Sequence, residues 1–494
     1  MFVIYNKFSK ITSFGSLRKF CMKAAKSKVE CPFSNRKSVG QPTSETHPHL
    51  LSEGEVTPMI TKCEYQNRRA GLVESILKYV SRIGLIQKNH MIVIPAASKQ
   101  YMSDKIPYVF RQNTEFLYLT GCQEPDCCVV ITVGEGGSHC TTLFTRDRDE
   151  HAELWDGPRT HSTDAVSFFG VDQSLPISEL EKFLISYKKS HKDSSLWCDL
   201  LTPVQKNIRN LMLEIGHKKW ENPKPFLHKL RLYKSPSEIA LMQRACDITA
   251  QAFMETMSFS RPGIGENQIF AKVDYECRMR GAEYLAYPPV VAGGERSTII
   301  HYINNNQLIH EDEMILMDAG CEYHGYASDV TRTWPVNGKF SPQQREIYEI
   351  VYCVHQELIE MCSKYPTLDS LFESMCFLLG KRLQEIGLLG IQPSNAYLMK
   401  AAYQLCPHHV SHYLGMDIHD TPTIDRNIKI EPGMVITIEP GIYINEKNKL
   451  LPKEYQGIGV RIEDDVLITV NGPVVLSRKC PKHIDDIEKL VCRQ

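Results

Sequence analysis

Four acidic residues interrupt apolar, strand-like runs in the second half of the chain. Asp318 and Asp329 lie in MILMDAGCEYHGYASDVTRTWPV, and Glu439 and Glu463 lie in MVITIEPG and GVRIEDD. A buried carboxylate is costly without a partner, so four of them together predict a shared site for divalent cations. A salt-bridge network is the alternative, but it needs matching buried cations, and the two glutamate runs contain only Arg461.

The two aspartates lie on either side of a glycine-containing turn, and this pattern predicts a hairpin that brings them together. Exposed aspartates are common in hairpins, so the pair alone favours a solvent-facing position. The apolar neighbours Leu316, Met317 and Ala319 favour burial instead. Because strand residues alternate between faces, Arg461 and Glu463 are expected to project to the same side.

Histidines complete a candidate metal site. His408, His409, His412 and His419 lie in the loop-like segment CPHHVSHYLGMDIHD. The sequence has no HExxH pair, so a single-zinc protease of the helix-borne type is not indicated. A site of one histidine and four carboxylates is rich in oxygen and favours manganese, with cobalt or zinc as substitutes.

The elements that would position these residues follow from hydrophobic periodicity. Helical spacing predicts a helix from near Cys63, and MIVIPAA predicts a strand from Met91. Helix and strand patterns alternate to about residue 200, as in an α/β domain. A capping box of Ser235 and Glu238, with Pro236 at the first helical position, predicts a second long helix. We therefore expect one domain over residues 57–230 and a catalytic domain over residues 231–494.

Length and composition indicate a globular protein of two domains. The chain has 494 residues, 42% of them hydrophobic, and a formal net charge of -1, which gives no support to nucleic-acid binding. No apolar run is long enough to span a bilayer. The 17 cysteines are odd in number and form no CxxC pair, a pattern that favours reduced thiols.

The first 56 residues are predicted to be a transit peptide and a linker. Up to residue 37 the segment has one acidic residue, Glu30, among nine basic ones, and it lacks a long apolar stretch, as is typical of a mitochondrial transit peptide. A basic tail that stays in the cytosol is the alternative. Residues 38–59 have no periodicity and are predicted to be the linker.

Four motifs resemble the aminopeptidase P group of the pita-bread metallopeptidases. They are DAGCEYHGYASDVTRTWPVNGKF, HHVSHYLGMDIHD, GMVITIEPGIY and GVRIEDD. The first domain adds YVFRQNTEFLYLTGCQEPD and ELWDGPR, which are similar to the creatinase-type N-terminal domain. The linker and YPPVVAGGERS resemble the mitochondrial branch, which is related to intermediate-cleaving peptidases. The resemblance implies an α/β (α+β) protein whose catalytic domain has a curved, pseudo-twofold antiparallel sheet flanked by helices, and it suggests a homodimer.

Carried over by position, the resemblance implies five ligands for two metal ions. Asp318 would bind one ion, His412 and Glu439 the other, and Asp329 and Glu463 would bridge them. Further matches are expected around the substrate. They are His301, His408 and His419 as histidines of the site, Tyr287 and Tyr443 in its wall, and Arg461 beside the last ligand.

The implied reaction is removal of the first residue of a peptide, preferentially before proline. Two metal ions can share a water and lower its pKa, so that a bridging hydroxide attacks the scissile carbonyl. His301 or His419 would stabilise the oxyanion. The implied substrates are peptide or protein N-termini, including imported mitochondrial proteins that lose one residue after presequence cleavage. The enzyme is expected in the mitochondrial matrix, with a cytosolic form as the alternative.

Two other functions use the same residue pattern. A prolidase, which cleaves only Xaa-Pro dipeptides, has the same five ligands. A pita-bread domain can also be a catalytically silent module that binds other proteins, but such modules have lost ligands. All five ligand positions are filled here, and this favours the enzyme.

Overall fold

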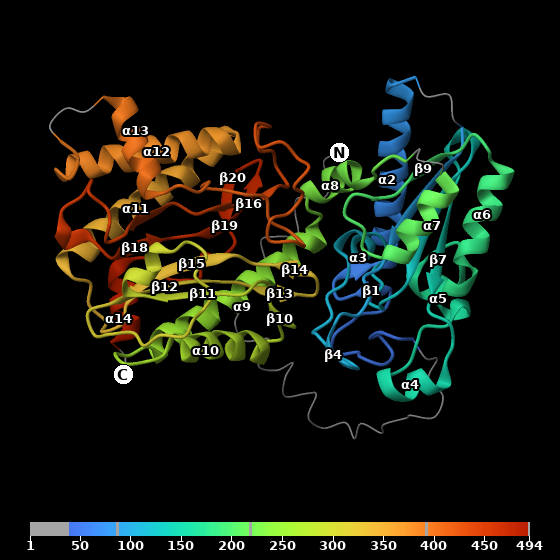
Figure 1. Cartoon of the computed structure of the whole chain (residues 1–494), viewed down its shortest axis with the longest axis horizontal. Helices are drawn as coiled ribbons and strands as arrows, with labels where there is room; N and C mark the ends of the chain where they lie inside the picture. Colours follow the sequence, from blue (N-terminus) through green and yellow to red (C-terminus); the bar gives the residue numbers. More distant parts are fainter. Residues whose placement is uncertain (1–38, 85–87, 217–219, 391–393, 493–494) are drawn as a thin grey trace. The chain divides into compact units, whose positions relative to one another are not determined.

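A computed structural model describes residues 39–84, 88–216, 220–390 and 394–492 (Figure 1). The described residues begin at position 39, so the basic segment that is predicted to be a transit peptide lies outside them. Among the described helices, none has both the length and the apolar character needed to cross a bilayer. The cysteines in the described residues are all free thiols.

The first long helix, α2, confirms the helical prediction near Cys63. It spans Lys62–Arg82, and its N-cap Thr61 accepts a hydrogen bond from the backbone N–H of Glu64. Such a cap satisfies one of the free N–H groups of the first turn. The apolar residues at helical spacing form the buried face of α2, which therefore packs into the N-terminal region. These residues are Tyr65, Leu72, Val73, Ile76 and Val80.

A mixed five-stranded sheet forms the centre of the N-terminal region, with the strand order β8-β7-β6-β3-β9. The strand predicted from Met91 is β3, which begins one residue earlier. The strands are β3 (His90–Pro95), β6 (Cys128–Val133), β7 (His139–Thr145), β8 (Gln173–Pro176) and β9 (Ser195–Trp197). The helices that accompany them are α3 (Thr114–Thr120), α4 (Glu150–Asp156), α5 (Ser162–Phe169), α6 (Leu180–Ser190) and α7 (Lys206–Gly216). This alternation confirms the α/β prediction. A separate hairpin consists of β4 (Tyr101–Ser103) and β5 (Ile106–Pro107).

Residues 39–61 are packed against this region and do not form the linker that the sequence predicts. The buried side chain of Gln41 donates to the carbonyls of Val56 (3.2 Å) and Gly121 (3.0 Å). Val56 and Ile60 are buried in the short strands β1 (Glu55–Thr57) and β2 (Ile60–Thr61). The segment lacks periodicity because single side chains, and not a repeating face, attach it to the protein.

The capping box predicted at Ser235 is present. Ser235 Oγ accepts from the N–H of Glu238 (3.2 Å), and the Glu238 carboxylate accepts from the N–H of Ser235 (2.8 Å). The helix that follows, α9, spans Pro236–Phe259. The helix before it, α8, spans Lys224–Leu232. The domain boundary expected at residue 230 falls within α8 and stays a prediction.

The C-terminal region repeats one arrangement of helices and strands, as the family resemblance implies. In its first half, α9 and α10 (Glu266–Met279) lie beside the antiparallel sheet β11-β12-β15 (Figure 1). The strands are β11 (Val290–Gly293), β12 (Met314–Ala319) and β15 (Val330–Pro335). A smaller sheet, β10-β13-β14, lies next to them in the chain and consists of β10 (Tyr284–Leu285), β13 (Cys321–Tyr323) and β14 (Tyr326–Ala327).

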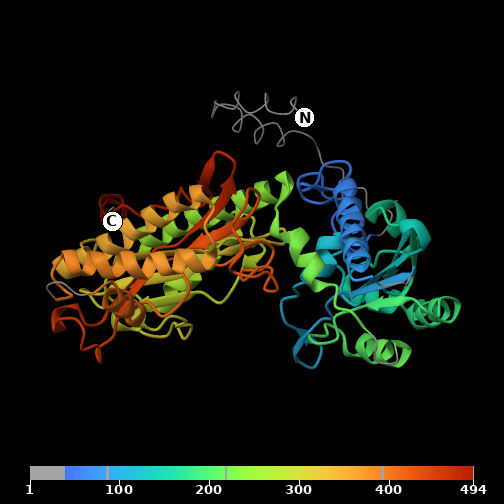
Figure 2. The same ribbon diagram turned by 90° about the horizontal axis from the view of Figure 1, so that it is seen from above.

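The second half has helices α11 (Pro342–Met361), α12 (Leu368–Glu385) and α13 (Asn395–Leu405). Figure 2 shows the two long helices α11 and α12, in orange, side by side along the strands. The strands are β16 (Val435–Ile438), β17 (Gly441–Ile444), β18 (Ile458–Arg461), β19 (Asp464–Thr469) and β20 (Gly472–Val475), and α14 (Ile484–Val491) follows. They form the antiparallel sheets β16-β19-β20 and β17-β18.

Two breaks in the strands of the second half differ from the expectation that Glu439 and Glu463 lie inside strands. β16 ends before Glu439 and β17 begins after Pro440, which has no N–H to donate to a ladder. β18 ends before Ile462, whose N–H donates to the carbonyl of Pro440. The N–H of Glu463 donates to the carbonyl of Thr331 in β15. Both glutamates therefore lie where the chain changes its pairing partner.

Candidate metal centre

Asp318 and Asp329 come together because β12 and β15 pair in antiparallel register. Asp318 lies opposite Thr331, and Asp329 comes directly before β15. The Tyr287 hydroxyl lies 2.6 Å from Oδ1 of each aspartate and can donate to either. The predicted hairpin is confirmed, with one difference. Residues 320–328 between the two aspartates form β13 and β14 of the neighbouring sheet and are not a simple turn.

Thr331 connects the aspartates to Glu463. Its hydroxyl donates to Glu463 Oε2 (2.6 Å) and accepts from Arg461 Nε (3.1 Å). Arg461 and Glu463 therefore point to the same site, as predicted. Thr331 is not among the residues predicted from the sequence. Its position two residues after Asp329 is the available signal, since it places Thr331 on the same face of the strand.

The ring of His412 has one nitrogen free for a metal ion. Nδ1 lies 3.1 Å from the Tyr413 carbonyl, and this contact requires an N–H at Nδ1. Nε2 then faces Asp329 Oδ2 (3.4 Å) and Glu439 Oε1 (3.7 Å). Ligand atoms of Asp329, His412 and Glu463 all lie within 4.8 Å of one another. A backbone carbonyl that fixes the tautomer is a common support for a metal-binding histidine.

The four carboxylates, here called the carboxylate cluster, repel one another. Burial and then the charges of Asp329 and Glu439 raise the pKa of Glu463 well above its ordinary value. Burial also raises the pKa of Glu439 to about 7. Burial lowers the pKa of His412, but its hydrogen bond to Asp329 and the charge of Glu439 outweigh this effect and raise it to about 9. The cluster therefore favours added positive charge.

Besides the His412 ring, one arginine offsets part of this charge. Arg461 Nη2 lies 2.6 Å from Asp318 Oδ2, and Nη1 donates to the Tyr443 hydroxyl (2.8 Å). Within the described ranges, it is the only lysine or arginine that pairs with any of the four carboxylates. The cluster therefore keeps excess negative charge, which suits divalent cations bound through oxygen ligands.

His408 is held in one tautomer. Its Nδ1 donates to the His409 carbonyl (2.8 Å), and its Nε2 accepts from the Tyr443 hydroxyl (2.8 Å). Burial, followed by the charge of Arg461, lowers the pKa of His408 to about 4, so the ring is neutral near pH 7. Glu439 Oε2 lies 3.7 Å from Nδ1. His408 therefore ties Tyr443 and Arg461 to the edge of the carboxylate cluster.

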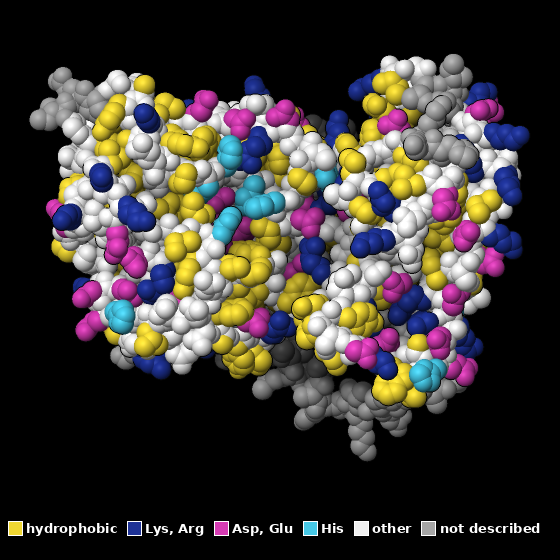
Figure 3. All heavy atoms as spheres, viewed as in Figure 1, with side chains coloured by type: hydrophobic (Ala, Val, Ile, Leu, Met, Phe, Trp, Pro, Cys, Tyr) yellow, Lys and Arg dark blue, Asp and Glu magenta, His cyan; other side chains and the backbone are white. Residues whose placement is uncertain are grey.

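The cluster opens into a cavity of about 530 Å³. His301 and His419 are exposed at its wall, and the ring centroid of His419 is 4.6 Å from that of His412. Figure 3 shows histidine side chains gathered beside acidic ones on the face seen in Figure 1. Ile300, Ile424 and other residues complete the wall. Asp318 and Glu439 line the cavity, so the carboxylate cluster is accessible from it.

All eleven residues that the family resemblance assigns to the site lie together here. Seven line the cavity, namely His301, Asp318, His408, His412, His419, Glu439 and Arg461. The other four contact these residues from behind, namely Tyr287, Asp329, Tyr443 and Glu463. His409, the other histidine of the same segment, also lines the cavity. One histidine nitrogen and several carboxylate oxygens form a donor set that fits divalent metal ions.

Two family models match the chain. One is described as metallopeptidase family M24 and matches residues 240–470, and the other is described as the aminopeptidase P N-terminal domain and matches residues 65–197. The family implies divalent metal ions, and the donor set agrees with that requirement.

Curated relatives cover most of the chain. Xaa-Pro aminopeptidase 3 of Mus musculus is 43% identical over 92% of this chain and 91% of its own length. The mitochondrial intermediate cleaving peptidase 55 of Arabidopsis thaliana is 38% identical over 92% of this chain and 88% of its own length.

The solved structure of Escherichia coli aminopeptidase P with the inhibitor Pro-Leu has the same fold. It is 34% identical to this chain and has a TM-score of 0.78, and the match covers 87% of this chain and 98% of that chain. This likeness confirms the predicted N-terminal domain and pita-bread catalytic domain. The chain therefore belongs to metallopeptidase family M24 and carries the N-terminal domain of aminopeptidase P.

Proposed function

We propose that this chain releases the N-terminal residue of peptides, preferentially where proline is the second residue. The observation that carries the proposal is the carboxylate cluster, which has one arginine paired with its four acids among the described residues and opens into a cavity of about 530 Å³. The relatives named as Xaa-Pro aminopeptidases support the same activity.

The proposed ligands would hold two divalent ions. Asp318 would hold one ion, His412 and Glu439 would hold the other, and Asp329 and Glu463 would be shared between them. When bound, such ions lower the pKa of a shared water and polarise the scissile carbonyl. We propose manganese as the native metal, with cobalt or zinc as substitutes, because oxygen ligands dominate the set.

The remaining residues of the site bind the peptide or support the metal ligands. His301 and His419 stand in the cavity wall, where their ring N–H groups can donate to a carbonyl oxygen that gains negative charge. Tyr287 holds the two aspartates from behind, and Arg461 fixes Asp318 and Tyr443. A bond that precedes proline has no N–H, so recognition depends on the shape of the ring and not on that donor.

Replacement of a bridging ligand tests the site. Asp329→Ala is expected to abolish both manganese binding, measured by calorimetry, and hydrolysis of an Xaa-Pro tripeptide. Lys339→Ala, at an exposed surface residue, serves as the control and is expected to keep both. Full activity of Asp329→Ala would overturn the assignment of the metal site.

A substrate comparison separates this function from that of a prolidase. The purified protein is given an Xaa-Pro dipeptide and an Xaa-Pro tripeptide at equal concentration, and we expect faster release from the tripeptide. Strict use of the dipeptide would favour a prolidase. No release from either substrate in the presence of manganese would favour a silent binding module.

We further propose a mitochondrial role for the enzyme. The relatives named intermediate cleaving peptidase support a mitochondrial location, and the basic N-terminal segment is consistent with a transit peptide. In the matrix the enzyme would remove single residues from imported proteins after presequence cleavage. Mapping of protein N-termini in mitochondria with and without the enzyme tests this role.

We also propose a homodimer, which light scattering of the purified protein would test.

A further inference from the structure

His419 stands on a loop that has neither helix nor strand. This His419 loop, residues 413–421, leaves the metal centre directly after His412. The N–H of Asp420 bonds the carbonyl of Tyr413 (2.9 Å) and closes the loop at its base. His419 itself is exposed to the cavity, so the conformation of the loop determines where its ring lies.

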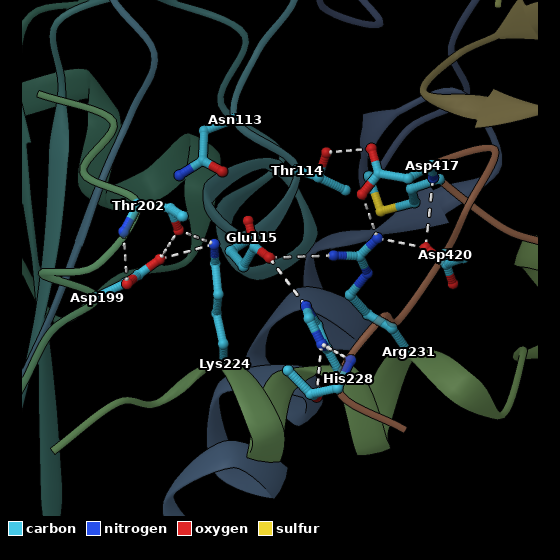
Figure 4. A network of polar contacts seen from close by, with 12 residues as sticks. Asn113, Thr114, Glu115, Asp199, Thr202, Lys224, His228, Arg231, Asp417 and Asp420 are labelled. Atoms are coloured by element: carbon cyan, nitrogen blue, oxygen red, sulfur yellow. Dashed lines mark hydrogen bonds and ion pairs between the residues drawn. The ribbon is translucent and has the colours of Figure 1, made fainter. Parts of the chain in front are cut away.

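A group of charged side chains, here called the clamp, holds the residues on both sides of His419. Figure 4 shows three of its members, Arg231, Asp417 and Asp420. Arg231, on the last turn of α8, pairs through Nη2 with Asp420 Oδ1 and with Asp417 Oδ2 (2.8 Å). Lys234 Nζ lies 3.2 Å from the other oxygen of Asp420. The side chains of Arg231, Lys234 and Asp420 are at most 2% exposed. In such surroundings paired charges fix geometry strongly.

The clamp is attached to the N-terminal region at the first turn of α3. Thr114 Oγ1 donates to Asp417 Oδ1 (2.8 Å), and Glu115 Oε1 lies 3.3 Å from Arg231 Nη1. The same glutamate oxygen lies 3.3 Å from His228 Nε2, whose ring accepts from the N–H of Thr423 (3.4 Å). Figure 4 shows these side chains converging between α3, α8 and the loop. The N-terminal region therefore helps to hold the catalytic histidine loop.

Backbone strain is an independent sign that the loop is held. Thr421 has φ of 51°, although a β-branched residue is a clear outlier at positive φ. Its side chain is fully buried, and its hydroxyl has no hydrogen-bond partner among the described residues. Residues in such conformations persist only where the surroundings enforce them. The ion pairs of Asp420, the residue directly before Thr421, provide that constraint.

We infer that Arg231 is a positioning residue for the aminopeptidase reaction. It pairs with Asp417 and Asp420 and so fixes the His419 loop, which places the His419 ring in the cavity beside His412. The inference rests on the proposed function, because it assigns work to His419 during peptide cleavage. Arg231 does not line the cavity, so its effect on the reaction passes through the His419 loop.

A double-mutant cycle tests this coupling. The kcat and KM for an Xaa-Pro tripeptide are measured with manganese for the wild type, Arg231→Gln, His419→Ala and the double variant. A shift of about 1 Å at a catalytic group can cost ~10²-fold in rate, so we expect kcat of Arg231→Gln to fall by about that factor. In the His419→Ala background, Arg231→Gln should lower kcat by less than about threefold, since the group that it positions is gone.

The control removes another buried ion pair that is far from the site in the chain. Arg146→Gln breaks the pair with Glu124 (2.8 Å) in the N-terminal region and is expected to leave kcat unchanged. If Arg231→Gln does not fold, Thr114→Val and Asp417→Asn weaken the clamp less severely and enter the same cycle. Arg231→Lys keeps the charge and is expected to recover part of kcat.

Three outcomes would overturn the inference. Arg231→Gln could keep wild-type kcat, it could lower kcat equally in both backgrounds, or His419→Ala could have no effect in an active enzyme. A wild type that cleaves no Xaa-Pro peptide would instead overturn the proposed function, so the two failures differ. A crystal structure of Arg231→Gln gives a readout besides activity, and a displaced His419 ring with Thr421 at negative φ is expected.

Discussion

The carboxylate cluster and the clamp are two groups of buried or half-buried acids, but they differ in the cations around them. The cluster has four carboxylates and one paired arginine. The clamp has Asp417 and Asp420 against Arg231, Lys234 and Arg111, which lies 3.0 Å from Asp417. The protein therefore neutralises the clamp itself, whereas the cluster is left to metal ions.

The pKa values follow this difference. In the cluster, burial and neighbouring acids raise the pKa of Glu463 well above its ordinary value. At Asp417, burial also raises the pKa, but Arg231 and Arg111 outweigh it and lower the pKa to about 2. A buried acid therefore indicates a metal site only where lysine and arginine are scarce around it. Asp464, the residue after Glu463, is a further buried acid whose charge is neutralised by the protein, because it pairs with Arg332 (2.7 Å).

Removal of the metal should have the largest effect. Dialysis against a chelator is expected to reduce Xaa-Pro hydrolysis by more than ~10³-fold, because the ions supply the activated water. Manganese should restore it. The metal-loaded protein should also be more stable to urea, by about 2.7 kcal/mol at a hundredfold excess over Kd. A chelated protein that keeps its activity would contradict the difference drawn between cluster and clamp.

Glu463→Gln should separate activity from stability. Activity is expected to be lost, because the amide is a poor bridging ligand. In the presence of chelator, the melting temperature should rise above that of the wild type. The reason is that ionised Glu463, with its raised pKa, destabilises the metal-free fold above the ordinary pKa of the group. Differential scanning calorimetry at pH 7 measures the melting temperatures of the wild type and of Glu463→Gln. A lower melting temperature would show that Glu463 is stabilised without metal.

The sequence predicts the cluster well because its evidence is local. Each acid lies within an apolar run, and the spacing of Arg461 and Glu463 places them on one face. The helix starts near Cys63 and at Ser235 are also encoded within a few residues, and both are present. The five ligand assignments depended further on the family resemblance, and the structure brings the assigned residues together.

The clamp could not be predicted, because its members come from distant parts of the chain. Arg231 and Asp420 are 189 positions apart, and Thr114 and Asp417 are 303 positions apart. Nothing in KLRLYKSP marks Arg231 as the partner of a loop beside the metal centre. The packing of residues 39–61 was missed for a similar reason, since Gln41 finds its partners at Val56 and Gly121. The strand breaks at Glu439 and Glu463 depend on a change of pairing partner, which hydrophobic periodicity does not show.

Asp420→Asn should have the opposite effect on stability to Glu463→Gln. Loss of one partner of a buried ion pair leaves the other charge unpaired and costs ~3–5 kcal/mol. We expect a loss of this size from Asp420→Asn, since Arg231 and Lys234 are almost fully buried. Urea denaturation in the presence of chelator measures it. A neutral effect would mean that the clamp is no better neutralised than the cluster.

The pH dependence of Asp417 should give the smallest effect. Because its pKa is lowered from 3.8 to about 2, its ionised form stabilises the folded protein. This contribution is fully present above pH 3.8 and is lost as the pH falls through about 2. The side chain is 32% exposed, so solvent screens the pairs, and Asp417→Asn should cost only about 1 kcal/mol at pH 7. Urea denaturation from pH 7 to pH 3 should show the difference between wild type and Asp417→Asn narrowing. A difference that does not change with pH would mean that the carboxylate acts through hydrogen-bond geometry and not through its charge.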